Sequence, residues 1–270
     1  MKLKLACVQF HSRPGEVAYN LDQMTRWCEH ARAAGAEVAL FPEACLTGYC
    51  RPREMTGLAM PFAGALADRL AELARVNKLL LAFGMPERDG AAIYNSLIAI
   101  APDGRELARY RKTHLWAAET RWAKAGDCFV SFQTEQAHFG LMLCYDTRFP
   151  EVSRALALRG VTILLVASAW RSSHVEEWRF CARARALDNG VFLAGSDAIL
   201  DADHFKCAGG SLIAGPAGEI LAQARYHEES MIVAEIDTAA LAARRRDLPL
   251  LEQRRPELYA AAGVCSTLPP

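Results

Sequence analysis

Three reactive side chains, far apart in the sequence, each lie at or just after the end of an apolar run that predicts a buried strand. Glu43 comes two residues after "EVALF", Lys112 closes "ELARYRK", and Cys144 closes "FGLMLC". In α/β proteins, functional groups gather beyond the carboxyl ends of strands. The three side chains are therefore expected to occupy equivalent positions on one scaffold, where a carboxylate, an ammonium and a thiol can meet.

Hydrolysis of an unactivated amide needs this set of groups. A nucleophile attacks the carbonyl carbon, a base takes its proton and later activates water, and a cation or donor stabilises the oxyanion. We assign these tasks to Cys144, Glu43 and Lys112, with the backbone N–H of Tyr145 as a second oxyanion donor. Glu119 follows Lys112 by seven residues. It is expected to orient the ammonium or to hold the leaving amine, because a lone buried ammonium is costly.

Each of these residues, taken alone, has a simpler structural explanation. A cysteine at the end of an apolar strand usually packs in the core. A glutamate after proline usually lies in a solvated turn, and a lysine that ends a hairpin usually lies at the surface. The catalytic interpretation therefore depends on the three types occurring together.

As a set, these stretches resemble the nitrilase superfamily of carbon-nitrogen hydrolases. "FPEACLTGY" is similar to the family's glutamate motif, "YRKTHLW" with Glu119 to its lysine motif, and "GLMLCYDTRFPE" to its cysteine motif, in the same order. The similarity continues through residues 181–192, residues 209–224 and "EID" near residue 235. It therefore covers nearly the whole chain.

The resemblance implies a triad of Glu43, Lys112 and Cys144 assisted by Glu119. It also implies a four-layer αββα sandwich of two facing sheets, a homodimer that extends it into αββααββα layers, and an enzyme without a metal or organic cofactor. The turn "CYDTRFPE" is more similar to the amidase branches, omega-amidase-like enzymes included, than to the Cys-Trp-Glu turn of true nitrilases. After "VFLAG", where many relatives carry an Asn-Arg-like pair, this chain reads "SDAILDADHFKC", so a relative's substrate does not transfer to it.

Further residues near the motifs outline a substrate pocket. Three aromatic residues follow strand ends and either line the acyl side or cap the sheet core: Tyr49, Trp116 and Trp170. The planar fork of Arg148 suits a substrate carboxylate. The stronger expectation for Arg148 is pairing with Asp146, Glu151 or a partner subunit.

Strands and helices alternate along the chain in two similar halves. "KLKLACVQF", a helix over residues 19–34 and "EVALF" form a β-α-β unit; a helix over residues 66–76 leads to "LLLAFG" and to a hairpin around "PDG". The second half has "FGLMLC", a helix from Pro150 to Gly160, "VTILLVASA", a helix over residues 174–188 and four more strands. Two such halves predict two sheets packed face to face and covered by helices.

The chain shows no linker, so residues 1–270 are predicted to form a single carbon-nitrogen hydrolase domain. A C-terminal arm is expected from about residue 239, where a tail with five arginines begins. The 31 Lys and Arg residues balance the 31 Asp and Glu residues. This balance disfavours nucleic-acid and membrane partners and favours small molecules or other subunits; the small molecule expected from the reactive residues is an amide.

The nine cysteines contain no CxxC pair, which argues against a disulfide framework and a zinc ribbon and predicts reduced thiols in a cytoplasm. The apolar part of "MKLKLACVQF" is too short for a signal peptide, and no run approaches the roughly 18 apolar residues of a membrane helix. HExxH, P-loop and GxGxxG patterns are absent, in agreement with a cofactor-free enzyme. Asp201, Asp203, His204 and Cys207 cluster, but their spacing fits no common metal site.

The leading hypothesis is an amidase that acts on a small linear amide through a thioester intermediate. One alternative is N-carbamoyl amine hydrolysis, which uses the same triad and releases carbon dioxide along with ammonia. Another is a non-catalytic binding protein on the same scaffold. A Cys-His hydrolase using His114 is a further possibility, but we expect this side chain to point away from Lys112 and to matter less.

Overall fold

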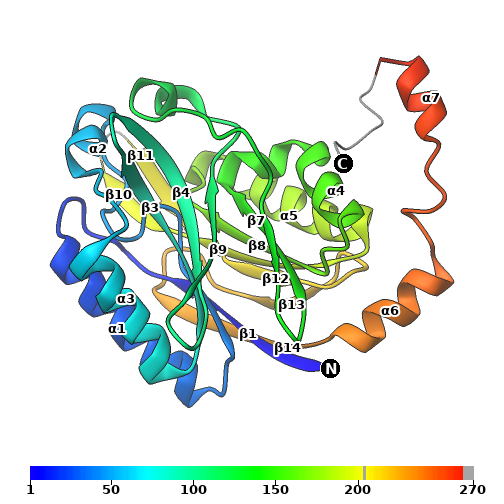
Figure 1. Cartoon of the computed structure of the whole chain (residues 1–270), viewed down its shortest axis with the longest axis horizontal. Coiled ribbons are helices and arrows are strands. Elements are labelled where there is room, and N and C mark those ends of the chain that lie inside the picture. Colours follow the sequence, from blue (N-terminus) through cyan, green and yellow to red (C-terminus); the bar gives the residue numbers. More distant parts are fainter. Residues whose placement is uncertain (203–204, 264–270) are drawn as a thin grey trace.

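Two six-stranded sheets face each other, and helices cover their outer faces (Figure 1). The computed structural model describes residues 1–202 and 205–263. The first sheet has the order β14, β1, β2, β3, β4, β5, with bounds Ser230–Asp237, Lys2–Gln9, Val38–Leu40, Leu80–Asp89, Ala92–Ile100 and Glu106–Arg111. The second has the order β13, β12, β9, β8, β7, β6, with bounds Ile220–Gln223, Leu212–Ala214, Phe192–Asp197, Ile163–Ser168, His138–Leu143 and Ser131–Gln133. The predicted αββα sandwich is confirmed.

Each sheet has a parallel centre, β1–β2–β3 in the first and β7–β8–β9 in the second, flanked by antiparallel strands. Parallel strands that are buried on both faces read as continuous apolar runs, which is why their sequences show little alternation. A separate two-stranded ladder joins β10 (Ile199–Ala202) to β11 (Phe205–Ala208). This ladder reaches the cleft described below.

The helices lie in two outer layers. α1 (Val17–Ala33) and α3 (Gly64–Asn77) pack on the first sheet, and α4 (Pro150–Leu158) and α5 (Val175–Asn189) pack on the second. These four agree with the predicted helices to within a few residues. The short α2 (Pro52–Leu58) was not predicted.

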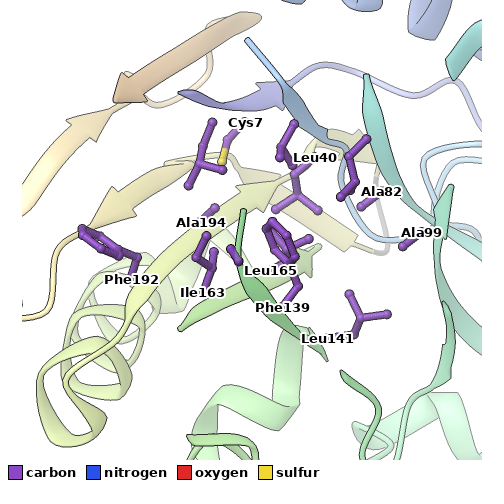
Figure 2. Close-up of a cluster of buried hydrophobic side chains, with 14 of the residues drawn as sticks. Cys7, Leu40, Ala82, Ala99, Phe139, Leu141, Ile163, Leu165, Phe192 and Ala194 are labelled. Atoms are coloured by element: carbon purple, nitrogen blue, oxygen red, sulfur yellow. The ribbon is translucent and has the colours of Figure 1, made fainter. Parts of the chain in front are cut away.

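The core between the sheets is built from small and branched side chains that interdigitate (Figure 2). Leu40 and Ala82 of the first sheet face Leu165 and Ala194 of the second, and Phe139 fills the space beside them. Burial of this apolar surface stabilises the two sheets against each other. It thereby fixes the relative positions of the strand ends that carry the candidate site.

The last strand joins the first sheet rather than the second. β14 follows β13 in the chain, but it pairs antiparallel with β1 over eight residue pairs, from Lys2↔Asp237 to Gln9↔Ser230. The order of elements had suggested that all late strands belong to the second half. Strand pairing across more than two hundred residues depends on the tertiary arrangement, which no local pattern encodes.

The chain continues past β14 into α6 (Thr238–Asp247) and α7 (Pro256–Ala261), which extend along one side of the molecule (Figure 1). The Asp237 side chain caps α6 by accepting the Ala239 N–H at 2.9 Å. Arg245 donates to the carbonyl oxygens of Gly190 and Val161 and ties α6 to the second sheet's helix layer. No helix in the described part of the chain is long and apolar enough to span a membrane.

Replacing a side chain of the inter-sheet core tests this packing. Leu165→Ala removes a fully buried side chain and should lower the free energy of unfolding by about 2–5 kcal/mol. Leu221→Ala, at a position 41% exposed, is the control and should change it by less than about 0.5 kcal/mol. Urea denaturation measures both; equal effects would contradict the assigned core.

Candidate active site

The three reactive residues follow the ends of three strands, each of which stops one residue earlier than the sequence predicted. Glu43 follows β2, Lys112 directly follows β5, and Cys144 directly follows β7. The loop that carries Glu43 crosses β3 at Gly84, where a Cβ atom would lie 2.7 Å from the Glu43 Cα. Only glycine permits this approach of two backbones. The first sheet thus supplies the carboxylate and the ammonium, and the second supplies the thiol.

Backbone strain concentrates around these residues. Cys144 has φ +41°, Ala44 has φ +50° and Ala117 has φ +43°, three of the five non-glycine residues with positive φ in the described part of the chain. The left-handed conformation costs about 1–2 kcal/mol for a residue with a Cβ. Such strain persists where the surroundings fix the conformation, and it is frequent at active sites.

Asp146 supports the strained turn that Cys144 opens. Its buried carboxylate accepts the backbone N–H of Leu143 at 2.9 Å and the hydroxyl of Tyr110 at 2.7 Å. His114 also contacts it, with Nδ1 at 2.9 Å from Oδ1. These bonds fix the end of β7, from which the Cys144 side chain enters the cleft.

A buried ion cluster forms the floor of the cleft. Lys112 is 1% exposed, and its Nζ lies 2.8 Å from Oε1 of Glu43 and 2.8 Å from Oε1 of Glu119. Asn95 Nδ2 donates to the same two oxygens, at 2.6 and 2.9 Å. The backbone N–H of Ala169 donates to the other oxygen of Glu43 at 2.9 Å. Both carboxylates are therefore oriented by donors, as buried charges require.

Glu119 is held from its other side as well. The Tyr49 hydroxyl donates to its Oε1 at 2.8 Å, and the backbone N–H of Trp116 donates to its Oε2 at 2.6 Å. With Lys112 and Asn95 also bound, Glu119 has few lone pairs left for a substrate. The geometry thus favours orientation of the ammonium over a direct hold on the leaving amine.

Burial and mutual charge set the proton affinities of the cluster. Burial raises the pKa of Glu43, and the charge of Lys112 only partly offsets this. Burial by itself lowers the pKa of Lys112. The negative charges of Glu119 and Glu43 raise it by more than burial lowers it, so the pKa lies well above its usual value. Burial, and next the charge of Glu43, raise the pKa of the Cys144 thiol well above its usual value. The resting thiol is therefore protonated and needs a base.

All nine site residues predicted from the sequence line one cavity of about 310 Å³. The reactive side chains are joined there by the predicted pocket residues Tyr49, Trp116, Tyr145, Arg148 and Trp170. Tyr49 stacks on Phe205 of β11 at 5.0 Å between ring centroids, and Trp116 tilts against the same ring at 6.2 Å. The aromatic residues therefore form walls of the cavity.

Arg148 pairs with Glu177 of α5, so the prediction that it pairs with Asp146 or Glu151 is wrong. Asp146 is occupied by the bonds that hold the Cys144 turn. The Arg148 guanidinium also lies 5.2 Å from the centroid of the Trp170 ring. The side chain lines the cavity, but its charge is already balanced by an acid.

Several lining or supporting residues were not anticipated: Asn95, Ala169, Arg171, His174 and Phe205. The signal for Asn95 was present, because the polar pair Asn-Ser interrupts the apolar strand "IYNSLIAI". Arg171 directly follows the predicted pocket residue Trp170, but nothing in the sequence shows where its side chain points. Phe205 reaches the cavity only because the β10–β11 ladder folds toward it.

His114 does not line the cavity. It stacks on Phe149, with ring centroids 3.9 Å apart, and contacts Asp146. A strand that continued through both residues would not separate His114 from Lys112, because residues two apart on a strand share a face; the prediction that it would do so is wrong. The actual reason is that β5 ends at Arg111, so the chain has left the strand before His114.

The acidic segment considered for metal binding is only partly described, because Asp203 and His204 lie outside the described residues. Asp201 pairs with Lys206 at the surface, and Cys207 is buried. Within residues 1–202 and 205–263, no three His, Cys, Asp or Glu side chains converge on a point suited to a metal ion.

Comparisons with known proteins agree on one family. Residues 4–246 match the family model described as carbon-nitrogen hydrolase. The chain is 33% identical to omega-amidase NIT2 of Homo sapiens, over 88% of this chain and 91% of the relative. It is 32% identical to an (R)-stereoselective amidase of Pseudomonas sp, over 94% of this chain and 92% of the relative.

A solved structure gives the same result. This chain superposes, with a TM-score of 0.86, on a mutant of the amidase from Nesterenkonia sp. AN1. That structure shows covalent addition of the acetamide moiety of fluoroacetamide at the active site cysteine. The two chains are 26% identical, and the match covers 96% of each. The shared fold thus extends over nearly the whole molecule.

The electrostatic coupling of Glu43 to the thiol is testable. Because the negative charge of Glu43 raises the pKa of Cys144, Glu43→Gln should lower that pKa. The pH dependence of iodoacetamide alkylation at Cys144, followed by mass spectrometry, measures the change. Glu54→Gln, at an exposed acid outside the cavity, should leave the profile unaltered; an unchanged or raised thiol pKa in Glu43→Gln would refute the coupling.

Proposed function

The chain belongs to the carbon-nitrogen hydrolase family, and on that premise we propose that it hydrolyses a small linear amide to ammonia and a carboxylic acid through a thioester on Cys144. The observation that supports this most is the cavity floor, where Lys112 is fixed by Glu43 and Glu119 beside Cys144. An unactivated amide needs a nucleophile, a base and an oxyanion donor together. This arrangement offers all three.

In the proposed first half-reaction, the substrate carbonyl lies between Cys144 Sγ and Lys112 Nζ. Glu43 takes the thiol proton as sulfur attacks the carbonyl carbon, and the developing oxyanion is stabilised by the Lys112 ammonium and the Tyr145 N–H. The raised pKa of Glu43 suits a base that must also give its proton away. It passes that proton to the leaving nitrogen, so ammonia departs and a thioester remains.

In the second half-reaction, water enters where ammonia left. Glu43 takes a proton from the water, hydroxide adds to the thioester carbonyl, and the same two donors stabilise the oxyanion. Collapse breaks the C–S bond and releases the carboxylic acid, while the thiolate regains its proton. Loss of a single oxyanion donor typically costs about 3 kcal/mol, so Lys112 is assigned a large share of the rate.

A cavity residue, Arg171, and one of the relatives both support an acyl group that carries a carboxylate. Arg171 lies with its guanidinium 4.7 Å from the Trp116 ring centroid and 5.4 Å from that of Phe205, and no described carboxylate pairs with it. One relative, from Homo sapiens, is an omega-amidase. Both observations favour an amide whose far end carries a carboxylate.

A homodimer and a cytoplasmic location belong to the same proposal. The homodimer is implied by the family resemblance, and α5 exposes the large apolar side chains Phe180 and Leu187, which a second subunit would cover. The eight described cysteines are free thiols, a state that a reducing compartment maintains. The single-domain assignment with a C-terminal arm likewise remains a prediction.

The nucleophile is tested by Cys144→Ala, which should abolish ammonia release from amides while circular dichroism and the unfolding midpoint stay near those of the wild type. Cys128→Ala, at an exposed cysteine, is the matched control and should keep full activity. Assay of carbon dioxide beside ammonia separates amide from N-carbamoyl hydrolysis. Full activity in Cys144→Ala would end the proposal.

The carboxylate preference is tested by comparing glutaramate with its neutral analogue pentanamide. Arg171→Gln should lower kcat/KM for glutaramate about 10–100-fold, the value of a hydrogen bond to a charged group, and leave pentanamide within about threefold. Arg225→Gln, at a surface arginine, should affect neither substrate. Equal losses of kcat/KM on the two substrates would show that Arg171 does not recognise the substrate carboxylate.

A further inference from the structure

Asp197 is a buried acid behind the cleft that the proposed mechanism does not use. It ends β9 and is fully buried. Its Oδ1 accepts the backbone N–H of Trp170 at 2.8 Å, and its own N–H donates to the Ser211 hydroxyl at 2.9 Å. Its Oδ2 is buried and forms no hydrogen bond with the described residues, and the same holds for the buried hydroxyl of Ser168.

The surroundings of Asp197 suit a neutral carboxylic acid. No cation among the described residues pairs with it, and the charged form of an acid is costly in such a place. Burial raises the pKa of Asp197 well above its usual value, and the charge of Glu43 raises it further, while the hydrogen bond from the Trp170 N–H opposes this rise. With its proton on Oδ2, the acid has a donor to offer to the facing hydroxyl of Ser168.

Asp197 is linked to Glu43 through one short segment of chain. The residues between them, Ser168 to Trp170, follow and include the end of β8. Asp197 holds this segment at the N–H of Trp170. On its other side, the N–H of Ala169 donates to Glu43 Oε2 at 2.9 Å, and the Glu43 N–H donates to the Ser168 carbonyl at 3.3 Å.

We propose that Asp197 is a positioning residue that works as a neutral carboxylic acid: it fixes the segment from Ser168 to Trp170, so that the Ala169 N–H holds Glu43 ready to take the Cys144 proton. The inference rests on the proposed amidase function. Asp197 does not line the cavity, so it acts through this segment and not on the substrate. A neutral acid and an amide have nearly the same shape, and each offers an acceptor oxygen beside a donor, although the amide carries one hydrogen more; asparagine should therefore replace Asp197 whereas alanine should not.

The test compares Asp197→Asn and Asp197→Ala with the wild type on one amide that the wild type hydrolyses. Asp197→Asn should keep kcat within about threefold. Asp197→Ala should lower kcat about 10–100-fold, as expected for a displaced catalytic group, with KM changed by less than about threefold. Asp201→Ala, at an exposed acid on the neighbouring β10, is the control and should change neither constant.

An infrared measurement tests the protonation state without activity. The wild type minus Asp197→Asn difference spectrum at neutral pH should contain the C=O stretch of a protonated carboxyl group. A carboxylate band in its place would overturn the proposal, as would an Asp197→Asn variant as impaired as Asp197→Ala, or an Asp197→Ala variant with wild-type kcat. If Asp197→Ala does not fold, the Asp197→Asn kinetics and the infrared band still decide.

The proposed amidase function and the positioning role of Asp197 can be refuted separately. A wild-type protein that releases ammonia from no amide or carbamoyl compound would refute the proposed function, and the infrared band would still test the neutral state of Asp197. An active wild-type enzyme whose Asp197→Asn variant loses kcat would refute only the positioning role.

Discussion

The ammonium of Lys112, buried between the carboxylates of Glu43 and Glu119 at 2.8 Å from each, constrains much of the surrounding structure. Removing one partner from such a cluster costs about 3–5 kcal/mol, because it leaves a buried charge uncompensated. Further donors around the cluster, among them Asn95 and Tyr49, supply the hydrogen bonds that the two buried carboxylates still require. The arrangement is thus stable only as a whole.

This cluster depends on how the two sheets pack. The first sheet carries the carboxylate and the ammonium, whereas the second carries Cys144 and the N–H of Ala169 that orients Glu43. The apolar core between the sheets (Figure 2) therefore does more than stabilise the fold, since it sets the distance between the thiol and its base. The left-handed backbone of Cys144 and the close approach at Gly84 lie at these same strand ends.

The same burial governs the proton chemistry. It raises the pKa of the Cys144 thiol and the pKa of Glu43, so burial favours the neutral form of both groups. Lys112 opposes both shifts and remains charged. In such a site a fixed ammonium stabilises a developing oxyanion more strongly than it would in water.

The sequence by itself determined the alternation of strands and helices along the chain, the four large helices and all nine residues predicted to line the cleft, because apolar runs, turn residues and family motifs are local features. Tertiary structure decided the pairing of β14 with β1, the partner of Arg148, and the roles of Asn95 and Asp197. These features join residues that are far apart in the chain. The direction of a side chain and the identity of its partner are set by packing between elements, which one-dimensional patterns do not record.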